Sequence, residues 1–157
     1  MTANTPSQRA QRWLDAFGAA LASGQPDNVL PLFDADCYWR DLVSFTWNIR
    51  TQEGHDAIRD MLAARQADTA ASNFQLEGEA TEADGVTEAW FTFETKVSRG
   101  RGHLRLKGDK AWTLLTTMVE LKGFEEKVFS SRPMGFCPGS SKKARMLPLP
   151  ASMKMCM

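Results

Sequence analysis

The hydrophobic pattern of this chain changes its period near residue 70, and this change limits the possible folds more than any other feature. Before it, apolar residues recur every three or four positions, as on one face of a helix. After it come four strand-like segments, "NFQLEGEATE", "VTEAWFTFETKV", "GHLRLKG" and "AWTLLTTMVEL". Their connections, "ADG", "SRGRG" and "GDK", have the composition of turns. The order predicts an α+β fold in which helices precede an antiparallel meander.

Three helices are predicted before the meander. The first covers residues 7–22, where Thr5 and Pro6 resemble a cap and first turn, and its apolar stripe is Ala10, Trp13, Leu14, Phe17 and Leu21. A short second helix is expected in "PDNVLPLF". The third covers about residues 54–67, and its period places Gln66 on the solvent side.

A strand over residues 37–43 is predicted between the second and third helices. Alternation puts Cys37, Trp39, Asp41 and Val43 on one face, and Tyr38, Arg40 and Leu42 on the other. Arg40 and Asp41 should therefore point apart and not form an ion pair. Asp41 falls on the more apolar face, before a loop whose Phe45 and Trp47 are placed to roof a cavity.

Composition excludes several classes of protein. The 157 residues suit one domain, and 19 basic residues balance 19 acidic ones, so no net field favours nucleic acid or an anionic membrane. We find no signal-peptide core and no apolar run of membrane-spanning length, which predicts a cytoplasmic protein. Cys37, Cys137 and Cys156 form no metal-binding spacing, and their odd number favours free thiols. No metal is expected.

The last 30 residues differ from the rest of the chain. Residues 128–157 contain no acidic residue, five of the eight methionines and four of the seven prolines, without a period of 2 or 3.6. We therefore expect a domain over residues 1–127 and an irregular tail over residues 128–157. The composition suggests the hypothesis of a frameshifted or truncated gene.

The element order resembles the cone-shaped fold of the nuclear transport factor 2-like superfamily, over residues 7–127. Two segments, "YWRDLVSFTWNIRTQEGHDAI" and "GHLRLKGDKAWTLLTTMVELKGFEE", are similar to the SnoaL-like N-terminal region of some bacterial flavin-dependent monooxygenases. The resemblance implies a curved antiparallel or mixed sheet covered by about three N-terminal helices. It ends near "RPMG", and the chain lacks the GxGxxG loop of a flavin domain, so no cofactor is expected.

Enzymes of this fold, such as ketosteroid isomerases, polyketide cyclases and epoxide hydrolases, use a pocket carboxylate near this first strand, and Asp41 occupies a matching place. The resemblance implies proton abstraction or water activation, which an apolar wall would favour by destabilising the charged carboxylate. A structural or ligand-orienting role for Asp41 is the other reading. His55, at the start of the third helix, is a weaker candidate acid or base. The sequence shows no second pocket acid, so it does not decide whether the chain is an enzyme.

A ligand pocket and a dimer interface are also predicted. The expected pocket is lined by Trp13, Phe17, Trp39, Asp41, Phe45, Trp47, Phe91 and Phe93. Pairing Phe93 with Leu106 leaves residues 98–101 as a loop, and a two-residue turn at Gly108 and Asp109 then puts a set of apolar residues on the convex face. That set is Trp90, Trp112, Leu114 and Met118. A face so apolar predicts a homodimer through the sheet.

Two functions remain open from the sequence. One is a binding or dimerisation domain related to the N-terminal part of a flavin-dependent monooxygenase, with itself and a small apolar ligand as partners. The other is a cofactor-independent isomerase, lyase or hydrolase with Asp41 as general base. A cone filled by aromatic side chains would favour the first, and a ligand beside Asp41 would establish a pocket.

Overall fold

The computed structural model describes residues 4–127 of the chain. The chain consists of two units, Met1–Phe124 and Glu125–Met157. Only residues 125–127 of the second unit are described, so the predicted irregular tail lies outside the described residues. The following account concerns the first unit.

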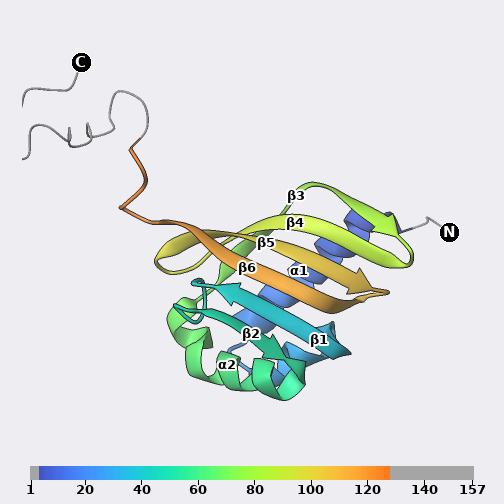
Figure 1. Ribbon diagram of the computed structural model, residues 1–157, viewed down its shortest axis with the longest axis horizontal. Coiled ribbons are helices and arrows are strands. Elements are labelled where there is room, and N and C mark those ends of the chain that lie inside the picture. Colours follow the sequence, from blue (N-terminus) through green and yellow to red (C-terminus); the bar gives the residue numbers. More distant parts are fainter. Residues whose placement is uncertain (1–3, 128–157) are drawn as a thin grey trace, which may run out of the picture. The chain divides into compact units, whose positions relative to one another are not determined.

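Over its described residues, 4–124, the first unit contains two α-helices, two short 3₁₀ turns and six strands (Figure 1). The helical elements are α1 (Pro6–Ala22), η1 (Pro26–Asn28), η2 (Leu30–Leu32) and α2 (Gly54–Thr69). The strands are β1 (Phe33–Leu42), β2 (Ile49–Glu53), β3 (Ser72–Ala83), β4 (Val86–Glu94), β5 (Ser98–Lys107) and β6 (Lys110–Leu121). This is the predicted α+β fold.

Helix α1 begins at a capping box. The Thr5 hydroxyl accepts a hydrogen bond from the Gln8 amide at 3.2 Å, and the Gln8 side chain accepts one from the Thr5 amide at 3.1 Å. These bonds satisfy donors that the first turn leaves unpaired. The helix ends before Gly24, which has a left-handed φ of 73°. The predicted apolar stripe of α1 is buried, as expected.

The predicted second helix is a pair of 3₁₀ turns, η1 and η2. Pro31 explains the difference, because it has no N–H to donate to a carbonyl one turn earlier and its ring would clash there. Two three-residue turns connect α1 to β1 without requiring that bond. Val29 and Leu30 still bury their side chains in the core.

The six strands form one mixed sheet in the order β2-β1-β6-β5-β4-β3. All neighbours are antiparallel except β1 and β6, which pair in parallel. In Figure 1, α1 crosses behind the sheet, in contact with β3 and β4, and α2 lies beside β1 and β2. We call the helix-covered side of the sheet the inner face and the opposite side the outer face.

The connection between β4 and β5 differs from the prediction. Phe93 pairs with Gly100 and not with Leu106, so the register is shifted by six residues. Residues 98–101 belong to β5, and the loop is residues 95–97. The reason is the close approach of Phe93 and Phe91 to two strand glycines: a Cβ on Gly100 would lie 2.3 Å from the Phe93 ring. These glycines make room for rings and do not mark a turn.

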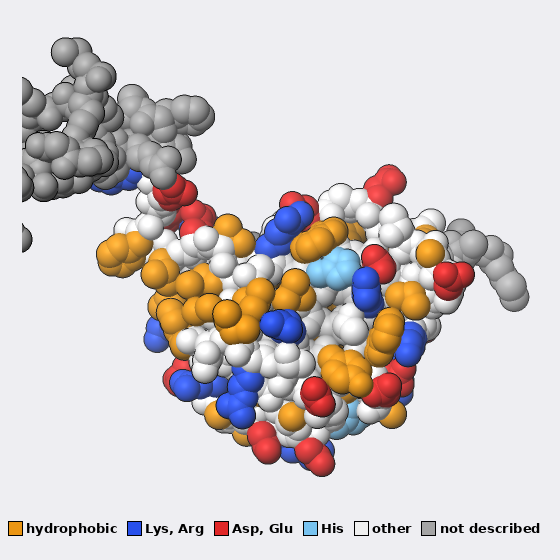
Figure 2. Space-filling model, in the orientation of Figure 1, with side chains coloured by type: hydrophobic (Ala, Val, Ile, Leu, Met, Phe, Trp, Pro, Cys, Tyr) orange, Lys and Arg blue, Asp and Glu red, His pale blue; other side chains and the backbone are white. Residues whose placement is uncertain are grey.

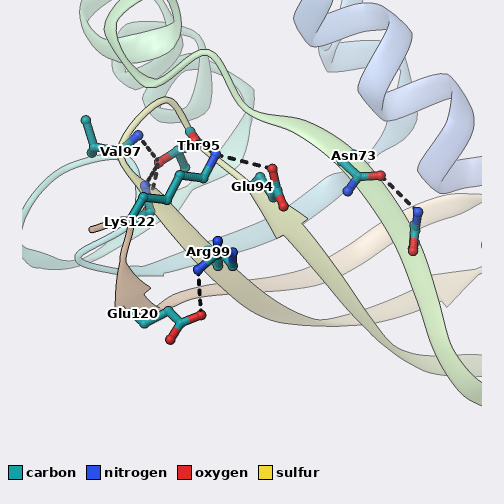
Figure 3. Close-up of polar contacts among 9 residues, drawn as sticks. Asn73, Glu94, Thr95, Val97, Arg99, Glu120 and Lys122 are labelled. Carbon is teal, nitrogen blue, oxygen red and sulfur yellow. Dashed lines mark hydrogen bonds and ion pairs between the residues drawn. The ribbon is translucent and has the colours of Figure 1, made fainter. Parts of the chain in front are cut away.

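The true loop between β4 and β5 is held by polar contacts (Figure 3). The Lys122 ammonium donates to the Thr95 carbonyl at 2.9 Å and to the Glu94 carboxylate at 3.2 Å. The Thr95 and Ser98 hydroxyls lie 2.7 Å apart. The end of β6 is therefore tied to this loop.

The turn at Gly108 and the strand after it were predicted correctly, but the sides to which the residues of that strand point were not. Lys107 pairs with Lys110 across the turn, and a bulge at Trp112 then reverses the alternation. Leu114 is consequently paired with Leu104 on the inner face and is 1% exposed. The expectation that Leu114 and Met118 lie on the outer face is wrong, since Met118 pairs with Gly100, which also faces inward.

Candidate functional site

Asp41 lies inside the cone, as the strand alternation predicted. Its neighbours on the inner face of β1 are Cys37 and Trp39, and all three are buried. Arg40 is exposed on the outer face, so Arg40 and Asp41 point apart. A carboxylate that is 0% exposed must be fully hydrogen-bonded, because burial of an uncompensated charge is very unfavourable.

The Asp41 carboxylate has hydrogen bonds on both oxygens. Oδ2 accepts from the amides of Phe45 and Thr46 at 2.9 and 2.8 Å, and from the Thr46 hydroxyl at 2.9 Å. Oδ1 accepts from the Thr116 hydroxyl at 2.7 Å, and that hydroxyl accepts from the Trp39 indole N–H at 2.9 Å. Asp41 thus joins β1, β6 and the loop between β1 and β2. Sequence reasoning missed Thr46 and Thr116, because the predicted alternation of β6 put Thr116 on the outer face together with Leu114 and Met118.

The loop held by Asp41 has a strained backbone. Val43 and Trp47 have φ values of 69° and 55°, in the left-handed region that side chains with a Cβ rarely adopt. The Asp41 hydrogen bonds lie between these two positions and fix the loop with Phe45 pointing inward, where its ring is 5.0 Å from the Trp39 ring. The chemistry of this carboxylate is therefore that of a loop anchor.

The residues predicted to line a pocket meet inside the cone, with one exception. Trp13, Phe17, Trp39, Phe45, Phe91 and Phe93 belong to a single buried cluster. Their rings are in contact, for example Phe17 with Trp39 at 5.6 Å and Phe45 with Phe93 at 6.2 Å. Trp47 is 54% exposed and does not roof the cone. Packed aromatic rings occupy the space in which a ligand was expected.

His55 is far from Asp41. Its Nε2 donates to the Asp34 carbonyl at 2.9 Å, which ties the start of α2 to the start of β1. Asp34 and Asp41 stand seven residues apart on β1, or about 20 Å along the strand. The two candidate catalytic residues do not form one site.

Gln66 is the residue whose placement the sequence misjudged most. The helical period put it on the solvent side, but it is 8% exposed, and its side-chain amide donates to the Leu21 carbonyl at 2.6 Å. The cause is that α2 runs on to Thr69, which brings Gln66 within hydrogen-bonding distance of the end of α1. Nearby lies a cavity of about 380 Å³ whose lining includes Gln66 and Phe45. Asp41 does not line it.

The outer face of the sheet is covered by no described helix. Figure 2, in the view of Figure 1, shows hydrophobic and basic side chains distributed across this face. Trp90 is 42% exposed, and its ring centroid lies 4.6 Å from the ring centroid of His103. The Arg101 guanidinium lies 4.4 Å from the centroid of the Trp90 ring, in a cation–π contact. Trp112 is half-buried under the Lys107 ammonium at 4.0 Å. Of the four predicted interface residues, only Trp90 and Trp112 have contacts on this face.

His103 titrates in this outer-face environment. Burial lowers the pKa of its imidazole below the usual 6.5; the Glu88 carboxylate, 3.8 Å from Nε2, partly opposes this, and Arg105 adds a smaller lowering. Near neutral pH the ring is therefore uncharged and packs on Trp90 as an aromatic group.

Within residues 4–127, no three His, Cys, Asp or Glu side chains are grouped as metal ligands would be. Neither described helix has the length and hydropathy needed to cross a bilayer.

Comparison with known proteins gives a likeness of fold. No family model matches the chain, and no curated protein matches it significantly. Among solved structures, a Novosphingobium aromaticivorans protein provisionally described as an aromatic ring hydroxylase is 22% identical, with a TM-score of 0.55 over 74% of this chain and 91% of that one. A ketosteroid isomerase-like protein from Erwinia carotovora atroseptica is 8% identical, with a TM-score of 0.60 over 75% and 99% of the two chains.

A third similar structure is described by its fold. A domain of unknown function from Nostoc punctiforme with a cystatin-like fold is 16% identical, with a TM-score of 0.54 over 75% of this chain and 80% of that one. At these identities the likeness concerns architecture and not activity. The chain has the α+β cone predicted from its sequence, and its fold is similar to the cystatin-like fold of this domain.

Proposed function

We propose that this chain is a non-catalytic module that forms a homodimer through the outer face of its sheet. The observation that carries the proposal is the contrast between the two faces. The inner face is filled by aromatic side chains, whereas the outer face has no described element against it and carries Trp90, which is 42% exposed. A filled cone favours a scaffold over a small-molecule enzyme.

The centre of the outer face has the composition of an interface core. Across β4, β5, β6 and β1 the register aligns Trp90, His103, Leu115 and Arg40 in one row. Aromatic residues and arginine are enriched in interfaces, where they supply large contact areas and directional hydrogen bonds. A two-fold axis near this row would bury Trp90 of one copy against the same patch of the other.

Ion pairs surround this row. Arg101 pairs with Glu77 at 2.7 Å, and Arg105 with Glu88 at 3.0 Å. Both signs of charge are present on the face, so two copies can approach without a net repulsion and exchange some of these partners. Charged pairs around a centre that contains aromatic and aliphatic side chains, here Trp90 and Leu115, are typical of protein interfaces.

The similarity of two segments to the SnoaL-like N-terminal region of flavin-dependent monooxygenases supports a module of this kind. A general-base role for Asp41 receives less support. Its oxygens are occupied by four hydrogen bonds from the protein, and neither of two surface cavities, of about 380 and 230 Å³, is lined by it. A base must instead reach the proton that it removes.

The test is the mass of the folded full chain in solution. At micromolar concentration, light scattering should give twice the 17.5 kDa of one chain. Trp90→Glu and Leu115→Glu should each give monomers, because they place a charge at the centre of the face. Ala64→Glu is the matched control, since Ala64 is exposed on α2, away from the outer face, and this variant should remain dimeric. A monomeric wild type, or a dimer that survives both outer-face variants, would overturn the proposal.

A further inference from the structure

The cavity beside Gln66 has the size of a small-molecule site. Its volume is about 380 Å³, and ligand pockets range from about 300 to 1,000 Å³. It is formed by the ends of α1 and α2, the start of β3 and the ring of Phe45. The lining residues are Leu21, Ala22, Gly24, Phe45, Gln66, Ala67, Ala70, Ala71 and Ser72.

The lining is mostly apolar and contains no charged side chain. A charged ligand would lose hydration there without gaining a partner of opposite charge, so the surroundings disfavour ions. The lining is rich in alanine, which leaves open space next to the rigid Phe45 ring. An uncharged, largely apolar molecule fits this chemistry.

Gln66 supplies a polar group that the protein itself does not satisfy. Its side chain is more than nine-tenths buried, and Nε2 donates to the Leu21 carbonyl at 2.6 Å. This bond fixes the orientation of the amide, because a flipped amide would set two oxygens against each other. The Oε1 atom has no hydrogen-bond partner. Buried acceptors of this kind normally have a donor, so the donor is expected from outside the chain.

We propose that this cavity binds a small, uncharged, mainly apolar molecule whose single hydroxyl or N–H group donates a hydrogen bond to Gln66 Oε1. The apolar body of the molecule lies against Phe45 and the alanines at the end of α2 and just after it, Ala67, Ala70 and Ala71. The site is separate from the outer face of the sheet, so its occupation does not depend on dimerisation. It is also separate from Asp41, which acts on it only by holding the loop that carries Phe45.

The test uses two probes of nearly equal shape, 1-naphthol and naphthalene, which differ by one hydroxyl. Each is titrated into the ¹⁵N-labelled full chain, and the backbone amide shifts of Ala67, Ala70 and Ala71 are followed by NMR. We expect saturable shifts at these amides, with naphthalene binding about tenfold more weakly because it leaves Oε1 unpaired. In Gln66→Leu the two probes should bind with equal affinity.

A second pair of variants tests the location without removing Gln66. Ala67→Phe fills the cavity and should abolish the shifts. Ala64→Phe is its matched control, because it makes the same change at an exposed position one turn earlier on α2, outside the lining, and should bind as the wild type does. Absence of saturable shifts, equal affinity of both probes for the wild type, or binding that survives Ala67→Phe would overturn the proposal. The first two results would mean that water occupies the site or satisfies Oε1.

Discussion

The Thr116 hydroxyl donates to Asp41 Oδ1 at 2.7 Å across the parallel pair of strands β1 and β6. The two residues are partners in the strand register and are both fully buried. This bond connects a series of hydrogen bonds that runs from the Trp39 indole through Thr116 and Asp41 to the strained loop, which ends at Asn48. It gives a structural role to Asp41, the one buried acid among residues 4–127.

Substitution of Asp41 is expected to destabilise the domain. Asp41→Asn replaces one of the two carboxylate oxygens by an NH2 group, which accepts no hydrogen bond, and removes the charge that strengthens the remaining bonds. It should lower the free energy of unfolding by about 1–3 kcal/mol. Thr116→Val should cost about 1–2 kcal/mol through its two lost hydrogen bonds. Urea unfolding monitored by tryptophan fluorescence measures both. Asp60→Asn, an exposed acid on α2, is the control and should change stability by less than about 0.5 kcal/mol. An Asp41→Asn protein as stable as the wild type would exclude the anchoring role.

The two glycines of β5 give a graded prediction. A Cβ on Gly102 would lie 2.1 Å from the Phe91 ring and 2.6 Å from the Leu115 carbonyl oxygen, whereas the three atoms nearest to a Cβ on Gly100 all belong to the Phe93 ring. Because the backbone cannot move aside as a side chain can, Gly102→Ala should destabilise by about 3 kcal/mol and Gly100→Ala by less. Differential scanning calorimetry ranks them.

Two further substitutions test this ranking, one in the same strand and one that replaces the ring facing Gly102. Arg101→Ala changes the exposed residue between the glycines and should cost less than about 1 kcal/mol. Phe91→Leu in the Gly102→Ala background should recover part of the loss, since it removes one of the two clashes. Equal costs for the two glycine substitutions would show that the Leu115 backbone contact does not matter.

The sequence was sufficient for the features that depend on local period. The alternation in residues 37–43 correctly placed Trp39 and Asp41 inward and Arg40 outward. The Asp84–Gly85 turn was recognised from its composition, and both residues have the positive φ that such a turn requires. The α+β cone follows from the order of these elements.

What the sequence did not supply depends on partners far along the chain. The partner of Asp41 is 75 residues away, and that of Gln66 is 45 residues away. The register of β4 on β5 depends on rings that pack over Gly100 and Gly102, and the glycines between charged residues resembled a turn. The bulge at Trp112 reversed the side of Leu114, which no alternation rule predicts. Strand β2 was missed because its short sequence buries only Gln52.

The Cys37 thiol is expected to be unreactive in the folded protein. Burial raises its pKa above 9.0; the Asp34 charge, and more weakly that of Asp36, act in the same direction against a backbone hydrogen bond from Gly54. In a Cys137→Ser/Cys156→Ser background, a thiol-specific chromogenic reagent at pH 7 should label Cys37 at least about 100-fold more slowly than in 8 M urea, since labelling requires opening of the core. Rapid labelling of the folded protein would contradict the burial of this thiol.

His103 should make the stability of the domain depend on pH between neutrality and mild acid. Because its pKa is lower in the folded than in the unfolded state, the unfolded chain binds a proton first as the pH falls. The contribution of the neutral His103 side chain to the stability of the domain is therefore fully present above the unfolded pKa of about 6.5. This contribution is lost as the pH falls through the pKa of His103 in the folded protein. His103→Gln should lose less stability than the wild type between pH 7.5 and pH 5.5, in urea melts at one fixed protein concentration. Glu88→Gln should lose more, because Glu88 raises the folded pKa and its removal lowers it further. Parallel stability curves for all three proteins would show that His103 does not control this window.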